Sequence, residues 1–261
     1  MRTPCLALLL AVAACEAEPP PIAFDGTEAR GAAARVAHGK RIAAVLGCTG
    51  CHGANLQGER FYELYASNLT RDLRGYSDAD IERVLRQGVP KDGRDLWGMP
   101  SEIFQHLSEP DMAALIAYLR TLEPAGGPTQ PPLPFPEEVR DLIARGEIKP
   151  AAAFVRDAKT VAPVDLGRQQ ALGRYITRVT CAECHGPELK GNQRDTPDLI
   201  VAGAYNRQEF EKLITQGMPS GGRKLKSELM AAVARERFAQ MTRHERDALY
   251  AYLKARAEQS R

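Results

Sequence analysis

The sequence contains one short pattern twice: Cys48-Thr49-Gly50-Cys51-His52 and Cys181-Ala182-Glu183-Cys184-His185. Each copy has two cysteines three positions apart and a histidine directly after the second cysteine. The chain has six cysteines, and only Cys5 and Cys15, close to the N-terminus, lie outside these copies. Four cysteines in an exported protein would ordinarily predict a disulfide framework. The histidine after each pair favours a different chemistry.

The pattern C-x-x-C-H is the attachment signature of a c-type haem. On a tight helical turn, the two thiols can add to the two vinyl groups along one edge of a porphyrin. The adjacent imidazole can then bind the iron, so His52 and His185 are the expected axial ligands. The expected covalent attachment points of two haem c groups are Cys48, Cys51, Cys181 and Cys184. One copy alone could also be a zinc half-site or a redox dithiol. Two copies favour haem.

The sequence around the two patterns also repeats, which is stronger evidence than either motif alone. Residues 35–46 and 167–179 are each predicted to form an amphipathic helix that leads into a cysteine pair. Farther on, Gln87-Gly88-Val89-Pro90 corresponds to Gln216-Gly217-Met218-Pro219. The chain is therefore predicted to contain two copies of one domain.

Each half ends in a further predicted helix, over residues 111–119 and 246–253. Apolar residues recur there at i, i+3, i+4 and i+7, so that one face of each helix packs on a core. Ser108 and Thr242, each followed three positions later by an acidic residue, resemble the starts of capping boxes. No strand-like alternation stands out, and the sequence predicts an all-α fold.

Each half resembles a class I cytochrome c domain: an N-terminal helix, C-x-x-C-H, connecting helices, a loop with an axial methionine and a C-terminal helix. The resemblance covers residues 31–123 and 165–257 and implies electron transfer. It also implies that the first and last helices of each half cross where a glycine meets an aromatic ring. The matching positions are Gly39 with Tyr118 and Gly173 with Tyr252. The segment 67–100 is similar to cytochrome subunits of membrane-bound bacterial alcohol, aldehyde and sugar dehydrogenases, which commonly carry three haem motifs where this chain has two.

The sixth ligand of each iron separates electron carriers from haem enzymes and gas-binding proteins. In the first half the candidate is Met99, because a thioether binds Fe(II) well and raises the reduction potential. Its neighbours Gly98 and Pro100 suit the tight loop that would bring the sulfur to the iron. The alternative is a methionine that only fills space in the core.

The second half contains two candidates. Met218 precedes a proline as Met99 does, but the repeat places Met218 opposite Val89. Met230 follows His185 at nearly the spacing of the first half. We therefore expect Met230 to be the ligand, with Met218 as the alternative.

Residues 124–164 are the expected linker between the two domains. Its first part is rich in proline and favours extended backbone, whereas residues 137–146 could form a short helix. The linker either holds the domains at a preferred separation or is a plain tether. The sequence favours neither reading.

Other polar residues are weaker candidates. Buried haem propionates need hydrogen-bond donors. Four side chains of the first half could supply them, or could equally be packing or surface residues: Tyr65, Asn68, Arg94 and Trp97. No haem contact is expected from the histidines outside the motifs: His38, His106 and His244.

The N-terminus is predicted to be a targeting segment. Arg2 provides a short charged region, and residues 6–14 form an apolar run that is too short to span a bilayer. The run ends in Val12-Ala13-Ala14-Cys15, which resembles the lipobox of bacterial lipoproteins.

This resemblance implies a signal peptide over residues 1–14, lipidation at Cys15 and a tether over residues 15–30. The alternative is a plain secretory signal in which Cys15 has no role. Glu16 weakly favours the outer membrane. No other stretch approaches the about 18 apolar residues that a spanning helix needs. The mature chain is expected on the periplasmic side of a bacterial membrane, held by lipid.

The formal net charge of +2 argues against broad binding to nucleic acid. We expect a dihaem electron carrier of a bacterial respiratory chain, which takes electrons from a dehydrogenase and passes them to an oxidase or another carrier. The alternative is a haem enzyme of the dihaem peroxidase type, or a haem sensor. Either would need one iron with an open or releasable site.

Overall fold

The computed structural model describes residues 21–61, 63–158, 160–192, 196–222 and 225–260. The predicted signal peptide and Cys15 lie outside the described residues.

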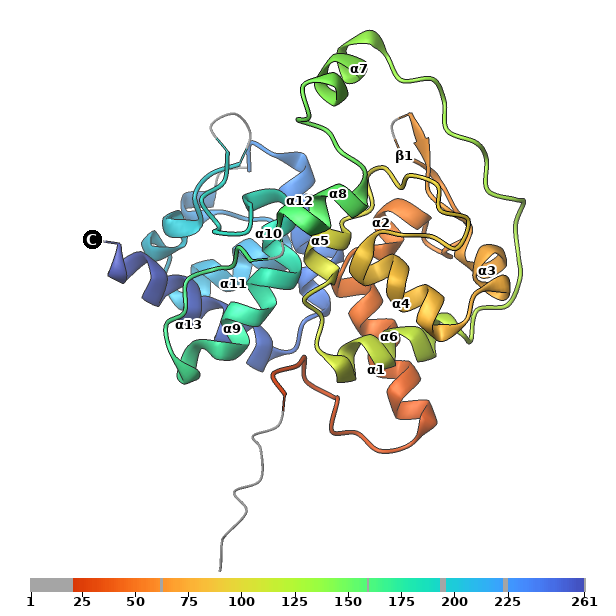
Figure 1. Ribbon diagram of the computed structural model, residues 1–261. Helices are drawn as coiled ribbons and strands as arrows, with labels where there is room; N and C mark the ends of the chain where they lie inside the picture. Colours follow the sequence, from red (N-terminus) through yellow and green to blue (C-terminus); the bar gives the residue numbers. More distant parts are fainter. Residues whose placement is uncertain (1–20, 62, 159, 193–195, 223–224, 261) are drawn as a thin grey trace, which may run out of the picture.

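Two helical halves lie side by side and are joined by a long segment that runs over the surface (Figure 1). The helices of the first half are α1 (Ala32–Val45), α2 (Cys48–His52), α3 (Leu69–Asp72), η1 (Leu73–Gly75), α4 (Asp78–Gln87), α5 (Ser101–Phe104) and α6 (Glu109–Leu119). Those of the connecting segment are α7 (Glu137–Ala144) and α8 (Ala151–Asp157). Those of the second half are η2 (Arg168–Gln170), α9 (Ala171–Ile176), η3 (Thr177–Cys181), α10 (Ala182–His185), η4 (Leu199–Ala204), α11 (Arg207–Gln216), η5 (Ser220–Gly222), α12 (Glu228–Glu236), η6 (Phe238–Gln240) and α13 (Arg243–Gln259).

The first and last helices of each half cross at a glycine. A Cβ atom added at Gly39 in α1 would lie 1.9 Å from the Ala114 carbonyl oxygen and 2.9 Å from Tyr118 Cβ, both in α6. In the second half, a Cβ at Gly173 in α9 would lie 2.5 Å from Tyr252 Cβ in α13. Only glycine allows the two backbones of each pair to approach so closely. The structure thus contains both crossings that the family resemblance implies.

Gly39→Ala is expected to lower the free energy of unfolding by about 2–3 kcal/mol, because the added methyl group meets a backbone carbonyl that cannot move without separating the helices. Chemical denaturation followed by far-ultraviolet circular dichroism measures the change. Gly75→Ala is the control, since a Cβ there has no atom within 4 Å. It should leave stability unchanged or raise it by less than about 1 kcal/mol. Equal losses in both variants would contradict the crossing.

The repeated Gln-Gly pair marks the end of equivalent helices. Gly88 ends α4 and Gly217 ends α11, both in the left-handed conformation, with φ of 67° and 68°. Glycine adopts this conformation without the steric cost that a Cβ imposes. Both helices also begin with a complete capping box, at Ser77 and at Asn206. The repeat seen in the sequence is therefore a repeat of one helix with the same start and stop signals.

Among the described residues, the all-α prediction is correct apart from one small hairpin. β1 (Arg60–Phe61) pairs with β2 (Leu64–Tyr65) in antiparallel register. Four paired residues are too few for an alternating pattern to be visible in the sequence.

The first part of the linker, up to residue 135, is held on the first half. Asn68 donates from its side-chain amide to the carbonyl oxygens of Ala125 and Gly127, at 2.8 Å each. The helix expected over residues 137–146 is α7, which stands away from both halves in Figure 1. The sequence did not predict α8, which packs against α4 and α5.

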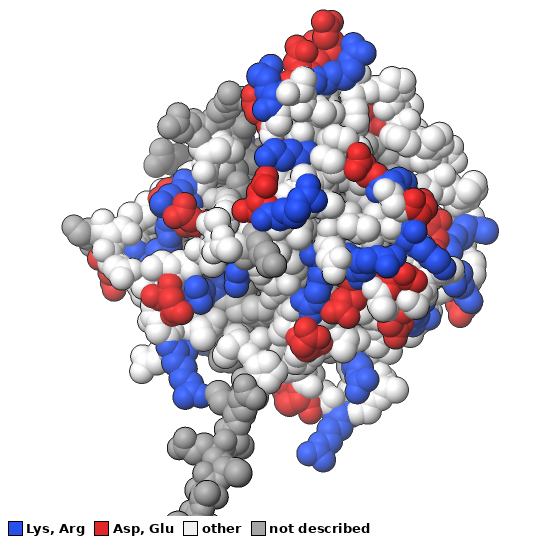
Figure 2. All heavy atoms as spheres, in the orientation of Figure 1, with Lys and Arg blue, Asp and Glu red and all other residues white. Residues whose placement is uncertain are grey.

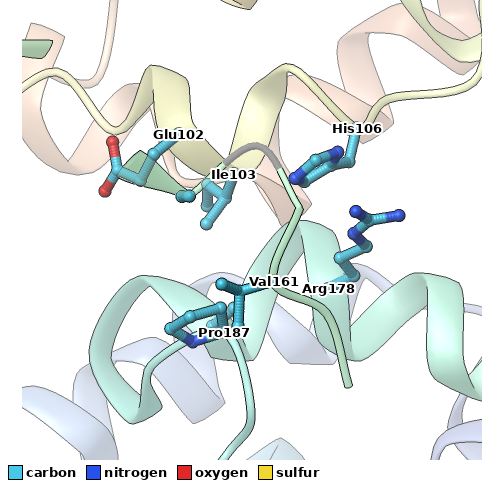
Figure 3. Close-up of a pocket in the computed structure, with 8 residues that line it drawn as sticks. Glu102, Ile103, His106, Val161, Arg178 and Pro187 are labelled. Carbon is cyan, nitrogen blue, oxygen red and sulfur yellow. The ribbon is translucent and has the colours of Figure 1, made fainter. Parts of the chain in front are cut away.

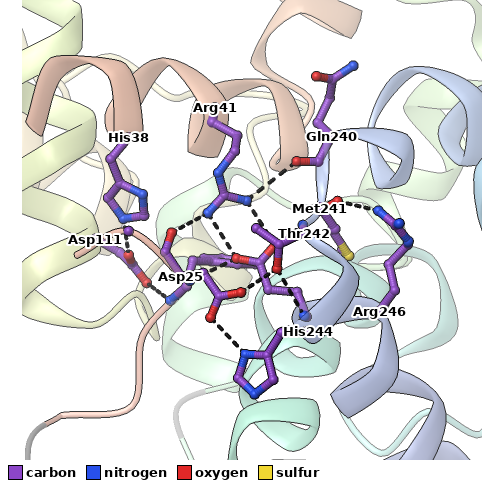
Figure 4. Close-up of polar contacts among 12 residues, drawn as sticks. Asp25, His38, Arg41, Asp111, Gln240, Met241, Thr242, His244 and Arg246 are labelled. Atoms are coloured by element: carbon purple, nitrogen blue, oxygen red, sulfur yellow. Dashed lines mark hydrogen bonds and ion pairs between the residues drawn. The ribbon is translucent and has the colours of Figure 1, made fainter. Parts of the chain in front are cut away.

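The two halves contact each other directly around two buried carboxylates (Figure 4). Asp111 accepts hydrogen bonds from the Phe24 amide (3.0 Å), from His38 Nε2 (3.0 Å) and from the Tyr175 hydroxyl of the second half (2.7 Å). Because the Asp111 side chain is 0% exposed, these donors replace the water that it loses. This carboxylate therefore joins the N-terminal segment and both halves.

Glu245 is the second buried carboxylate, at the equivalent place in α13. Its side chain is 0% exposed and accepts two hydrogen bonds from the Arg41 guanidinium of the first half, at 2.8 and 2.9 Å. The Asp25 amide donates to the same carboxylate at 2.8 Å. Asp111 and Glu245 are the acidic residues three positions after Ser108 and Thr242, which resembled capping boxes in the sequence. Both thus also hold the two halves together.

No helix in the described part of the chain is long and apolar enough to cross a membrane. Charges of both signs are interspersed over the face displayed in Figure 2. This mixture agrees with the small formal net charge of +2.

Candidate functional site

The first C-x-x-C-H motif forms a short helix between two glycines. Gly47 precedes α2 with a φ of 82°, and Gly53 follows it with a φ of 79°. Glycine adopts such positive φ values without steric cost, so the chain can change direction sharply at both ends of the turn. His52 Nδ1 lies 2.8 Å from the Ser67 carbonyl oxygen and donates to it in the neutral tautomer that this contact favours. The Nε2 atom is then left as the lone-pair nitrogen that an iron requires.

The second motif also ends at a glycine, but it is entered from a helix and not from a glycine. The π-helical segment η3 leads into α10, and Gly186 ends the turn with a φ of 75°. His185 Nδ1 lies 2.9 Å from the Pro197 carbonyl oxygen. Burial lowers the pKa of both His52 and His185, which keeps the two imidazoles neutral and able to bind a metal. The two sites are therefore equivalent in their histidine chemistry.

The cysteines lack the properties of a disulfide or a redox dithiol. None of the four motif cysteines forms a disulfide. Burial raises the pKa of Cys48 to about 12 and that of Cys181 to about 11, whereas reactive dithiols have a lowered pKa. A zinc half-site is also disfavoured, because no group of three or more His, Cys, Asp or Glu side chains in the described residues could hold a metal ion. Paired thiols beside a neutral, oriented imidazole fit covalent attachment of haem.

The three methionines singled out by the sequence differ in burial. Met99, after Gly98 with its φ of 76°, is partly buried and packs against the core of the first half. Met230 lies in the first turn of α12 and also packs against the core. Met218 is 46% exposed and lies beside Lys212 at the surface.

Two of the three remaining histidines contact aspartates, and the third lines a pocket. His38 is buried against Asp111, as described above. His244 is 71% exposed at its side chain and lies 2.9 Å from Asp25. His106 lines a pocket between the halves (Figure 3).

Three of the four propionate candidates have partners inside the protein. Asn68 is fully buried and holds the linker. Trp97 packs edge to face on Phe135 of the linker, with ring centroids 5.5 Å apart. Arg94 pairs with a neighbouring aspartate. These contacts support the packing and surface readings of the three residues.

The pocket in Figure 3 brings Glu102 of α5 close to the second half, where Arg178 and Pro187 line the opposite side. Burial raises the pKa of Glu102 to about 7, and its Oε2 atom has no hydrogen-bond partner among the described residues. Burial lowers the pKa of His106 to about 4, and the charge of Arg178 contributes. Both groups therefore favour their neutral forms inside the pocket.

Glu102→Gln is expected to remove a pH dependence of stability. The Glu102 pKa is higher in the folded state than its ordinary 4.5, so wild type loses stability relative to the variant as the pH rises from 4.5 through 7. The difference should reach about 2 kcal/mol above pH 7, after allowance for partial exposure. Chemical denaturation of both proteins between pH 4 and 8 measures it, with the exposed Glu138→Gln as control. A difference between wild type and Glu102→Gln that does not change with pH would contradict the burial of this carboxyl.

Comparison with known proteins decides the family. The sequence profile of the cytochrome c family matches residues 36–123 and again residues 170–257. The chain belongs to the cytochrome c family. It carries two haem c groups, one in each domain, and its function is electron transfer.

Several bacterial relatives of this cytochrome are named as redox proteins. It is 28% identical over 207 residues to a nicotinate dehydrogenase subunit of Pseudomonas putida, a match that covers 72% of this chain and 17% of that protein. It is 27% identical over 205 residues to a diheme cytochrome c-type protein of Cereibacter sphaeroides, covering 70% of this chain and 68% of the relative. It is 25% identical over 171 residues to the fructose dehydrogenase cytochrome subunit of Gluconobacter japonicus, covering 58% and 35%. The chain thus spans only part of the dehydrogenase subunits it matches.

Sequence reasoning did not single out Glu183 and Arg237. Arg237 Nη1 donates to Glu183 Oε2 at 2.8 Å, beside the second haem attachment turn. Glu183 occupies a variable position of the motif, and Arg237 follows α12 without any motif of its own. Only the fold brings Arg237 to the turns.

Proposed function

We propose that this cytochrome accepts electrons from a dehydrogenase and delivers them to an oxidase or another carrier on the periplasmic side of a bacterial membrane. Three relatives named as cytochrome subunits of fructose, alcohol and gluconate dehydrogenases support a dehydrogenase donor. The observation that carries the proposal is the direct contact between the halves next to both sites. The helix α5, which follows Met99, packs against η3, which leads into the second haem turn.

Cys48, Cys51, Cys181 and Cys184 are the proposed thioether links, and His52 and His185 the proximal iron ligands. Bound haem supplies a reversible one-electron step, and the protein sets its potential through ligands and burial. The carbonyl groups of Ser67 and Pro197 fix the orientation and tautomer of the two imidazoles.

Met99 and Met230 are the proposed sixth ligands. Both are partly buried against the core, where a thioether is shielded from water, whereas Met218 is at the surface. Two methionine-ligated irons leave no open coordination site. This favours an electron carrier over a peroxidase or a gas sensor.

A lipid on Cys15 is the proposed membrane anchor, on the basis of the lipobox-like sequence that precedes it. Cys15→Ser should then release the protein from membranes while it keeps both haems. Retention of the variant protein in the membrane fraction would mean that a partner, and not the lipid, anchors it.

Purification from native membranes, followed by haem staining, tests the proposed donor. We expect the cytochrome to co-purify with a dehydrogenase. The reduced protein should not bind carbon monoxide rapidly at neutral pH, because both irons have a sixth ligand. Rapid, stoichiometric binding of carbon monoxide would contradict the carrier function and favour a haem enzyme or sensor.

A further inference from the structure

Arg237 lies between the two haem attachment turns. It follows α12 in the second half, and its Nε atom donates to the Val45 carbonyl oxygen at the end of α1, at 3.1 Å. Its Nη1 atom donates to Glu183 inside the second motif, at 2.8 Å. A Cβ atom added at Gly47, the residue before Cys48, would lie 2.7 Å from Arg237 Nε. One guanidinium therefore touches the entry to the first turn and the middle of the second.

The Arg237 charge is largely withdrawn from water. The side chain is 13% exposed, and its Nη2 atom is buried without a hydrogen-bond partner among the described residues. A buried donor left unpaired costs about 1–3 kcal/mol. The charge lies beside both attachment turns, through the contacts with Val45 and Glu183.

We propose that Arg237 is a positioning residue that holds the two haem attachment turns together and raises the reduction potential of both haems, and that Glu183 opposes this effect. The inference rests on the electron-transfer function. Oxidised haem iron carries one more positive charge than reduced iron, so a nearby guanidinium disfavours oxidation, while a nearby carboxylate favours it. The effect is larger in a partly buried site than at the surface, because water and salt screen the charge less.

Arg237→Gln in the full holoprotein tests the proposal by potentiometric titration of each haem. The variant removes the positive charge and leaves Glu183 without its partner, so both potentials should fall. We expect the reduction equilibrium constant of each haem to decrease by about threefold to tenfold, where tenfold equals about 59 mV for one electron. Glu183→Gln should shift both constants in the opposite direction.

Two further variants separate charge from packing. Arg237→Lys keeps the charge, so the potentials should stay within about twofold of wild type even if the contact between the halves weakens. Arg235→Gln removes one exposed charge from α12, the helix that Arg237 follows, and should also change the potentials by less than about twofold. If Arg237→Gln fails to fold, Glu183→Gln alone still tests the direction in which a charge at this place shifts the two reduction potentials.

The possible results are distinct. Opposite shifts of both haems in Arg237→Gln and Glu183→Gln support the proposal. Unchanged potentials in a protein with two attached haems, or a shift confined to one haem, overturn the role of Arg237 and leave the electron-transfer function intact. A wild-type protein that lacks haem overturns the function itself.

Discussion

Met230→Ala is expected to abolish the absorption feature of Met–iron ligation at the second haem, whereas Met218→Ala should leave it unchanged. Met230 packs against the core, while Met218 is 46% exposed beside Lys212. Loss of the thioether should lower the potential of that haem by about 0.1 V or more, since axial ligands spread haem potentials over about 0.8 V. Met99→Ala should have the same effect on the first haem.

Visible absorption spectra and redox titration of the three variants measure these effects. The variants also compare a loop ligand with a helical one, because Met99 precedes α5 and Met230 lies within the first turn of α12. If Met218→Ala removed the feature and Met230→Ala kept it, the repeat alignment of the second half would be wrong. The electron-transfer function would remain, with a different sulfur at the iron.

Arg41→Met is expected to lower the free energy of unfolding by about 3 kcal/mol. The Arg41 side chain is 22% exposed, and its partner Glu245 is fully buried, so the variant leaves a buried carboxylate without its counter-charge. The Asp25 and Thr242 amides still donate to Glu245 but do not neutralise it. Since this ion pair joins the two halves, small-angle scattering should also show a more extended protein.

Arg74→Met is the matched control for this ion pair. The Arg74 and Glu123 side chains are 56% and 89% exposed, so water and salt screen their attraction. We expect a loss below about 1 kcal/mol and no change in scattering. Equal losses in the two variants would contradict a special role for the buried pair between the halves.

Much of each domain could be predicted from the sequence because the deciding signals are local. Cys48 and His52 lie within one turn, and the end of α4 at Gly88 follows from one residue and its neighbours. The repeat then strengthened each weak local signal. Gly88 and Gly217, for example, end equivalent helices of the two halves.

The contacts between the halves could not be predicted in this way. Arg41 and Glu245 are distant in the sequence, and neither belongs to a pattern that indicates its partner. Arg237 reaches Val45 from the other domain. The packed position of α8 on α5 likewise depends on the surface that the first half presents, which is known only after folding. Local physics thus predicts the two domains, while long-range packing decides how they meet.

The mass of the denatured holoprotein tests the central claim most directly, because thioether-linked haem stays on the chain when the fold is lost. The account predicts a mass equal to the polypeptide plus two haems, and plus one haem for the double variant Cys181→Ser, Cys184→Ser. A denatured wild-type protein from haem-replete cells with fewer than two haems still bonded to it would contradict the account.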